Sequence, residues 1–291
     1  MQSKAGSVTF FALFSLMLFS STSSFAQSNP VPAAPVNQNL VTSTVGLKKE
    51  DAKPFAFTLT AARSRSLYDY KDGTLAETND FEFLPSYTWS KGKTTLYMTF
   101  SQDLRATDDA SDIGDMALIH SFKGWNFAKI KLAPSLTTTL PQSKLSREIK
   151  NLEGAISTKL TAAIQPKLLI TGLSLASSIS LGRSFHRYNT DITGALNNQY
   201  TSRQTILTSY AFGIFSIDTE FHHINAWTYN GTLKESFEHA EEASIALGDH
   251  FGFTLGHTNA GSIFKENGYE SNLKLIDDNN SLVYAKVSMQ Y

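Results

Sequence analysis

The sequence contains no cysteine among its 291 residues, few charged residues, and no long apolar run beyond its N-terminal segment. The lack of cysteine excludes a disulfide scaffold, a cysteine nucleophile and a thiolate metal site. A formal net charge of -1 leaves no broad basic surface of the kind that binds nucleic acid. A membrane-spanning helix needs roughly 20 consecutive apolar residues, so a helical membrane protein is excluded for the rest of the chain.

Motifs for covalent chemistry or cofactor binding are also lacking. The sequence contains no phosphate-binding glycine loop, dinucleotide fingerprint or zincin helix. His222 and His223 are adjacent, and adjacent residues of a strand point to opposite faces, so they cannot bind one ion together. We therefore expect no cofactor and no metal site, and we assign no catalytic residue.

The first 26 residues have the three parts of a secretory signal peptide. Lys4 lies in a short polar start, residues 8–19 are apolar, and the small residues Ser24 and Ala26 mark a cleavage site after Ala26. An apolar stretch of about 12 residues is too short to anchor a protein in a bilayer. The segment predicts export across the inner membrane.

Residues 27–54 hold four of the eight prolines. Proline cannot continue a helix or donate to a sheet ladder, so we expect an extended periplasmic lead-in. A weak alternation at 40–47 leaves a short first strand as an alternative. Residues 55–291 are expected to form the folded domain.

From Phe55 onward, apolar and polar residues alternate with a period of two. Phe55, Phe57 and Leu59 begin the pattern, and it recurs at 81–89, 95–100, 152–165 and 205–214. A period of two places one face of a strand in an apolar medium and the other in a polar one. Several of these runs reach the roughly 9–11 residues of bilayer-spanning strands, whereas strands of soluble proteins usually have about 5–6.

The connections between these runs are of two kinds. Short ones are expected at 91–93, 165–167 and 248–250, and long polar ones at 69–79, 105–113, 141–150 and 183–199. Short turns at one end and long loops at the other are typical of outer-membrane barrels, whose loops face the cell exterior.

The last nine residues, 283–291, also alternate and end on an aromatic residue. This segment resembles the C-terminal strand of bacterial outer-membrane barrel proteins, whose final aromatic residue is read by the assembly machinery. The resemblance implies that Val287, Met289 and Tyr291 form an assembly signal, with the barrel-assembly machinery as a partner.

These patterns predict an all-β protein, a monomeric transmembrane antiparallel up-and-down β-barrel in the outer membrane of a Gram-negative bacterium. At roughly 20 residues per strand and connection, residues 55–291 allow about 12 strands. The expected strand starts lie near residues 55, 80, 93, 114, 126, 151, 167, 200, 216, 236, 250 and 281. An ambiguous segment at 269–276 leaves 10 or 14 strands open.

If the apolar face contacts lipid, the alternate residues point into the lumen. The inward charges expected from the pattern are Lys129, Lys131 and Lys159 on neighbouring strands and Asp218, Glu220, Glu238 and Glu242 on another strand pair. Charges separated in this way would orient dipolar solutes, as in porin constrictions. The same charges would close the barrel if they paired with one another, and both alternatives stay open.

Two further segments carry a resemblance. Residues 114–118 read GDMAL and residues 136–144 read LTTTLPQSK. They are similar to outer-membrane transporters grouped with phenol-degradation and long-chain fatty-acid channels, which have a Gly-Asp strand start and a Pro-Thr-Gly loop. PQS at 141–143 replaces the usual Pro-Thr-Gly. The resemblance implies passive uptake of small solutes, hydrophobic ones included.

Residues 257–261 read HTNAG and are similar to the His-x-Ser-Asn-Ala stretch of outer-membrane lipid A deacylases. Asn259 occupies the position of the nucleophilic serine, and Thr258 is expected on the opposite face of the strand from His257. Acyl transfer needs a hydroxyl within reach of its base, so a lipid-modifying enzyme is the least favoured function. We expect Asn259 and Gly261 to shape an extracellular strand end.

The leading hypothesis is passive, porin-like diffusion of small solutes. The alternative is a closed structural or adhesion barrel that binds a partner through the loops at 69–79 and 183–199. Arg63, Arg65 and Arg183 are expected near the extracellular strand ends, where guanidinium groups suit lipopolysaccharide phosphates or supply ordinary interfacial charge.

Overall fold

A computed structural model of the chain describes residues 54–67, 76–105, 111–165, 169–265, 268–277 and 280–291. The expected signal peptide at 1–26 and the lead-in up to residue 53 lie outside these residues. No helix within the described ranges is long and apolar enough to cross a membrane.

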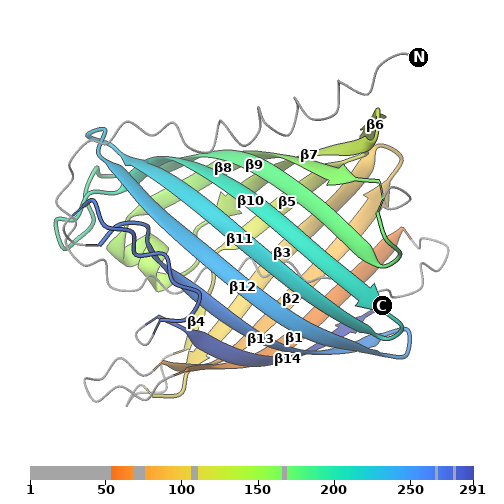
Figure 1. Cartoon of the computed structure of the whole chain (residues 1–291). Coiled ribbons are helices and arrows are strands. Elements are labelled where there is room, and N and C mark those ends of the chain that lie inside the picture. The colour runs from red at the N-terminus through yellow and green to blue at the C-terminus, as the bar shows by residue number, and fades with distance from the viewer. Residues whose placement is uncertain (1–53, 68–75, 106–110, 166–168, 266–267, 278–279) are drawn as a thin grey trace.

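The chain forms a closed antiparallel barrel of twelve strands, in which strands adjacent in sequence are adjacent in space (Figure 1). The first and last strands pair with each other and close the ring. The strands are β1 (Phe55–Ser66), β2 (Glu77–Trp89), β3 (Gly92–Asp103), β4 (Ser111–Ile113), β5 (Met116–Phe122), β6 (Trp125–Phe127), β7 (Ile130–Leu140), β8 (Leu152–Ile164), β9 (Leu173–His186), β10 (Asn198–Phe212), β11 (Phe215–Thr228), β12 (Leu233–Leu247), β13 (Phe251–Ser262) and β14 (Leu282–Gln290). The short pieces β4, β5 and β6 together make the fourth strand of the barrel.

The predicted fold class and strand number are confirmed, and the alternatives of 10 and 14 strands are wrong. The ambiguous segment at 269–276 adds no barrel strand and contributes only an isolated bridge between Phe264 and Ser271. Two predicted strand starts are early: β7 begins at Ile130 instead of near 126, and β9 at Leu173 instead of near 167. The residues near 126 belong to the preceding strand, because β6 pairs back onto β7.

The two ends of the barrel differ. Both β1 and β14 have their chain-terminal ends where the short turns lie, at 90–91, 128–129, 213–214 and 248–250. The connection at 165–172 lies at the same end and is longer than the turn predicted at 165–167. The opposite end carries the connections 67–76, 104–110, 141–151, 187–197 and 263–281, with one short exception at 229–232. Strands β9 and β10 extend into the loop expected at 183–199, so that loop is shorter than predicted. Long loops face the cell exterior in outer-membrane barrels, which places both barrel termini in the periplasm.

Alternation along each strand separates two environments. On β11, Ile217 points outward and is 53% exposed, whereas its neighbour Asp218 points into the lumen and is 5% exposed. Among the described residues most buried side chains are polar, and large apolar side chains are exposed around the whole exterior. This arrangement is the reverse of a soluble core. It suits a barrel whose exterior contacts lipid, and the chain is an outer-membrane β-barrel.

Candidate functional site: the barrel lumen

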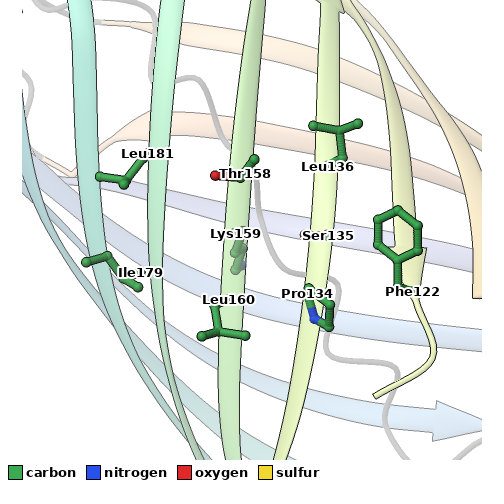
Figure 2. Close-up of a pocket in the computed structure, with 9 residues that line it drawn as sticks. All are labelled: Phe122, Pro134, Ser135, Leu136, Thr158, Lys159, Leu160, Ile179 and Leu181. Carbon is green, nitrogen blue, oxygen red and sulfur yellow. The ribbon is translucent and has the colours of Figure 1, made fainter. Parts of the chain in front are cut away.

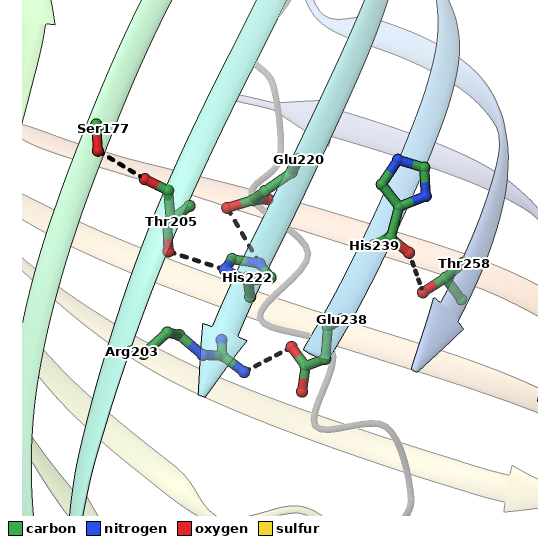
Figure 3. A network of polar contacts seen from close by, with 8 residues as sticks. All are labelled: Ser177, Arg203, Thr205, Glu220, His222, Glu238, His239 and Thr258. Atoms are coloured by element: carbon green, nitrogen blue, oxygen red, sulfur yellow. Dashed lines mark hydrogen bonds and ion pairs between the residues drawn. The ribbon is translucent and has the colours of Figure 1, made fainter. Parts of the chain in front are cut away.

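One polar network lines the lumen along β10, β11 and β12 (Figure 3). Arg203 on β10 reaches across β11 and forms an ion pair of 2.5 Å with Glu238 on β12. On β11, the imidazole of His222 lies between two partners: its Nδ1 is 2.8 Å from the Thr205 hydroxyl and its Nε2 is 3.2 Å from Glu220 Oε1.

This arrangement, in which an imidazole lies between a hydroxyl and a carboxylate, resembles a catalytic triad in which the imidazole activates a nucleophilic hydroxyl. However, Thr205, His222 and Glu220 are each at most 8% exposed, and their polar groups already contact one another. The contacts instead fix the Glu220 carboxylate and the imidazole against the wall. We interpret this trio as a structural part of the lumen lining.

A second network lies along β12, β13 and β14. The carboxylate of Glu242 accepts hydrogen bonds from the Tyr284 hydroxyl at 2.7 Å and from Lys286 Nζ at 2.8 Å. On the neighbouring strands β2 and β3, the Tyr97 hydroxyl donates to Glu82 at 2.9 Å. These bulky side chains fill the lumen beside β12, β14 and β2.

Small side chains line the inner face of β7, β8 and β9. This surface, called here the small-residue wall, consists of Ser135, Thr137, Ser157, Thr161, Ser178, Ser180 and Gly182. Lys159 on β8 is the long charged side chain on it, with Ser135 and Ser180 as its direct neighbours across the ladders. Open space in the lumen is therefore expected beside this wall rather than beside β12 and β14.

The residues predicted for the lumen divide into two groups. Five of them point inward from the middle of their strands: Lys159, Asp218, Glu220, Glu238 and Glu242. Lys131 has an inward register position but is exposed near the periplasmic end of β7. The expectation for Lys129 is corrected, because β7 begins only at Ile130 and Lys129 lies exposed in the turn before it.

Sequence reasoning missed two basic partners. Arg203 and Lys286 flank the acidic residues on β11 and β12 and pair with Glu238 and Glu242. Their inward positions follow from the same alternation, but the pattern does not say which charges meet across two strands. The predicted separation of charges is therefore reduced by direct pairing.

The two segments that resemble outer-membrane transporters meet at the loop end of the barrel. Asp115 accepts hydrogen bonds at Oδ1 from the backbone N–H groups of Gln142 at 2.9 Å and Ser143 at 3.0 Å. The hydroxyls of Ser143 and Ser146 also donate to this carboxylate, at 2.9 Å and 2.5 Å. The Gly-Asp break in the fourth strand thus fixes the loop that carries the short helical turn η1 (Leu145–Ile149).

The predicted assembly residues lie on the outward face of the closing strand. Val287 and Met289 pair with Ala61 and Leu59 of β1. The Tyr291 ring stacks on Phe57, with ring centroids 5.6 Å apart, and their backbones exchange two hydrogen bonds. The last residues of the chain thus help to close the barrel.

The arginines expected near the extracellular ends lie on the outer face and have protein partners. Arg63 forms an ion pair with Glu77. The guanidinium of Arg183 lies 5.0 Å from the ring centre of Phe185 and 5.5 Å from that of Tyr200.

A groove of about 420 Å³ runs along the wall near β7, β8 and β9 (Figure 2). Its lining is mostly apolar and includes Phe122, Pro134, Leu136, Leu160, Ile179 and Leu181. All six project to the outer face, so the groove contacts lipid. No group of three or more histidine, aspartate or glutamate side chains in the described residues could hold a metal ion.

The fold is shared with known outer-membrane proteins. The crystal structure of an outer-membrane channel from Pseudomonas putida F1 is similar with a TM-score of 0.55 and 10% sequence identity, covering 84% of this chain and 98% of that chain. The NanC porin is similar with a TM-score of 0.50 and 10% identity, covering 81% of this chain and 98% of that chain. No protein-family model matches the sequence, and no curated protein matches it either. The chain therefore has the porin-like fold of an outer-membrane β-barrel.

Proposed function

We propose that the barrel is a passive diffusion channel for small polar solutes. The observation that carries this proposal is the asymmetry of the lumen: bulky, paired side chains occupy the side of β12, β14 and β2, while small hydroxyl side chains line β7, β8 and β9. A polar solute finds hydrogen-bonding groups and one positive charge, Lys159, along that wall. The folds of the two similar structures, a channel and a porin, agree with it.

Charge in the lumen favours cations over anions. The inward acidic side chains in its middle part are Asp80, Glu82, Asp218, Glu220, Glu238 and Glu242, and the basic ones are Lys159, Arg203 and Lys286. A surplus of fixed negative charge attracts cations and repels anions in a narrow pore. A polar lining also favours polar solutes over the hydrophobic ones that the transporter resemblance implies.

The rival function is a closed barrel that acts through its loops. The extensive pairing on β10–β14 supports it, because Arg203, Glu238, Glu242 and Lys286 have neutralising partners within the wall. A deacylase-like activity at 257–261 lacks its nucleophile: Asn259 occupies the position where a hydroxyl would be needed, and Thr258 is 5% exposed on the lumen side. We propose that the chain carries out no covalent chemistry.

Conductance in a planar lipid bilayer tests the channel. The refolded barrel is expected to give discrete conductance steps and a reversal potential, under a salt gradient, of the sign for cation selectivity. Lys159→Glu should increase this selectivity, whereas Asp249→Asn in an exposed periplasmic turn should leave it unchanged. A correctly folded barrel without conductance would instead support the closed alternative.

We also propose that the C-terminal residues Val287, Met289 and Tyr291 are recognised by the barrel-assembly machinery. Removal of Tyr291 should reduce the amount of folded barrel in cells. A neutral change in the periplasmic turn, Asp249→Asn, serves as the control. Equal yields for both proteins would contradict the proposed signal.

A further inference from the structure

Four polar side chains lie together on the outer, lipid-facing wall of β12 and β13. We call His239, Glu241, His257 and Asn259 the outer patch. The strand register places His239 opposite Asn259 and Glu241 opposite His257. Successive residues of a strand point to opposite faces, and Glu242, next to Glu241 on β12, bonds to Lys286 in the lumen. Glu241 and the other residues of the outer patch therefore face outward. Polar and charged groups on the lipid side of a barrel are costly, so this cluster requires a physical explanation.

Polar atoms in the outer patch are buried without partners. His239 is 6% exposed and Asn259 is 1% exposed. Within the described residues, Nδ1 of His239, Nε2 of His257 and Oδ1 of Asn259 make no hydrogen bond. The other ring nitrogen of His239 lies 3.7 Å from Glu241 Oε1. Folded proteins rarely leave such atoms unsatisfied, and a cluster of them on one surface indicates groups that await a partner.

A segment of the β13–β14 connection covers the upper part of the outer patch. We call residues 272–276 the roof segment. Asn259 Nδ2 donates to the backbone carbonyl of Lys274 at 2.7 Å, and Asn272 Nδ2 donates to that of Ser262 at 3.3 Å. The roof segment thus lies against the outside of the wall. Leu275 and Ile276 on it are 67% and 56% exposed, a composition suited to contact with lipid.

The lower edge of the outer patch is open. The side chain of Glu241 is 53% exposed, and below His257 the wall continues with Leu255, which is 54% exposed. Asn259 and His257 lie three and five residues below the loop-side end of β13 at Ser262. With the rise and tilt of barrel strands, this is a depth of roughly 7–12 Å, near the level where lipid headgroups join their acyl chains.

The chemistry of the outer patch selects the kind of ligand. The amide oxygen of Asn259 and the carboxylate of Glu241 accept hydrogen bonds, and a carboxylate repels phosphate. The free nitrogens of His239 and His257 serve as donor or acceptor, depending on the tautomer. The complementary group is therefore a neutral hydroxyl or amide N–H located at the start of an acyl chain.

We propose that the outer patch binds the amide-linked hydroxyacyl portion of an outer-leaflet glycolipid. The amide and hydroxyl meet Asn259, His239 and His257, and the acyl chains extend along Leu255 and against the apolar side of the roof segment. The glycolipid approaches from the membrane at the open edge, where the side chain of Glu241 is 53% exposed. This binding does not depend on whether the lumen conducts.

A pair of matched lipids tests the hydroxyl contact. Native mass spectrometry would titrate the refolded barrel with a glucosamine lipid carrying an amide-linked 3-hydroxytetradecanoyl chain, and with the same lipid lacking the 3-hydroxyl. Loss of one buried hydrogen bond should weaken binding about tenfold. Phosphatidylethanolamine, which would be attracted by Glu241 alone, is the third ligand and is expected to bind more weakly than the hydroxylated lipid.

Variants test the place of binding. His257→Ala and His239→Leu should each weaken binding of the hydroxylated lipid about tenfold and remove the difference between the two matched lipids. His120→Ala is the control, because His120 is also outward-facing, on β5, and already contacts the Thr94 hydroxyl at 2.9 Å. Heat-dependent migration on gels reports whether each variant is folded. If His239→Leu fails to fold, His257→Ala at a half-buried position carries the test.

Equal affinity for the matched lipids would overturn the proposal. So would tighter binding of phosphatidylethanolamine, or binding by the folded His257→Ala protein that equals that of the parent.

Discussion

Lys286 and Glu242 form an ion pair of 2.8 Å although they lie on β14 and β12, with β13 between them. Gly256 on β13 lies between these strands, and because it has no side chain it leaves room for the ring of Tyr284. The Tyr284 ring lies over Gly256 and donates its hydroxyl to the same carboxylate at 2.7 Å. A single glycine thus allows three strands to share one buried polar contact.

A side chain at position 256 should break this arrangement. A Cβ atom there would lie 2.2 Å from the Tyr284 ring, so Gly256→Ala must displace the ring and its hydrogen bond to Glu242. Overpacking of this kind costs about 1–3 kcal/mol. The midpoint of urea unfolding in lipid vesicles, followed by tryptophan fluorescence, should fall accordingly. Gly261→Ala on the same strand is the control, because its Cβ would meet no atom closer than 3.6 Å.

Loss of one partner of the buried ion pair is expected to lower the stability of the barrel more than replacement of both partners. Lys286 is 3% exposed, and Lys286→Met leaves the Glu242 carboxylate buried, with a hydrogen bond from the Tyr284 hydroxyl but without its ion pair. Removing one partner of a buried pair costs about 3–5 kcal/mol. The double variant with Glu242→Gln should recover part of that loss in the same unfolding measurement. Additive losses in the double-mutant cycle would show that the two groups do not interact.

Asp115 should control the protease resistance of the loop at 141–151. Its carboxylate accepts four hydrogen bonds from Gln142, Ser143 and Ser146, and Asp115→Ala removes them all. Limited trypsin digestion of the intact barrel in vesicles is expected to cut the variant after Lys144 or Arg147 much faster than the parent. Asp249→Asn, in a turn at the other end, should digest like the parent. Equal rates for Asp115→Ala would mean that other contacts hold the loop.

The alternation of side chains was sufficient to predict the barrel, because a lipid exterior and a polar lumen impose a period of two on each strand. The same period predicts that Glu220 and Glu242 point inward, as they do in the structure. The partners of these residues were not predictable: whether Lys286 meets Glu242 depends on the register of three strands, and the contact of Tyr284 with Glu242 also depends on Gly256. Register is set by cross-strand packing, which a single sequence pattern does not contain.

The roof segment and the outer patch show another limit of the pattern. The sequence pattern predicts that Asn259 shapes an extracellular strand end, but Asn259 lies within β13 and donates a hydrogen bond to the carbonyl of Lys274. The segment at 269–276 has weak strand character, and its position on the outer wall follows from this tertiary contact. Local alternation predicts which face a residue occupies and says nothing about a loop that folds back onto that face.

Acidification is expected to destabilise the loop between β9 and β10, because it protonates the Asp191 carboxylate. Partial burial acts to raise the pKa of Asp191, but hydrogen bonds from the Thr193 hydroxyl and from the backbone N–H groups of Ala195 and Thr193 hold this pKa below its usual range. A lowered pKa means that the ionised form stabilises the loop. This contribution is complete above the usual carboxyl pKa of about 4 and is lost as the pH falls through the lower folded value.

Hydrogen exchange checks this pH dependence. Exchange at the amides of Thr193 and Ala195, corrected for the intrinsic effect of pH, should become faster on acidification in the parent protein. Asp191→Asn keeps an acceptor oxygen but does not titrate, so its corrected exchange should not change over the same range. A parent protein whose protection is constant down to the most acidic pH would contradict the assignment.

The small-residue wall provides the most direct test of where solutes pass. Ser180 on β9 points into the lumen beside Lys159, whereas its neighbour Ile179 points to lipid and is 40% exposed. Ser180→Phe adds a large ring to the space beside the wall and should reduce single-channel conductance several-fold. Ile179→Phe adds an aromatic ring one residue away on the outer face and should leave conductance unchanged. If both variants conduct like the parent, solutes do not pass along this wall, and if both lose conductance equally, the effect is on folding of β9 rather than on the lumen.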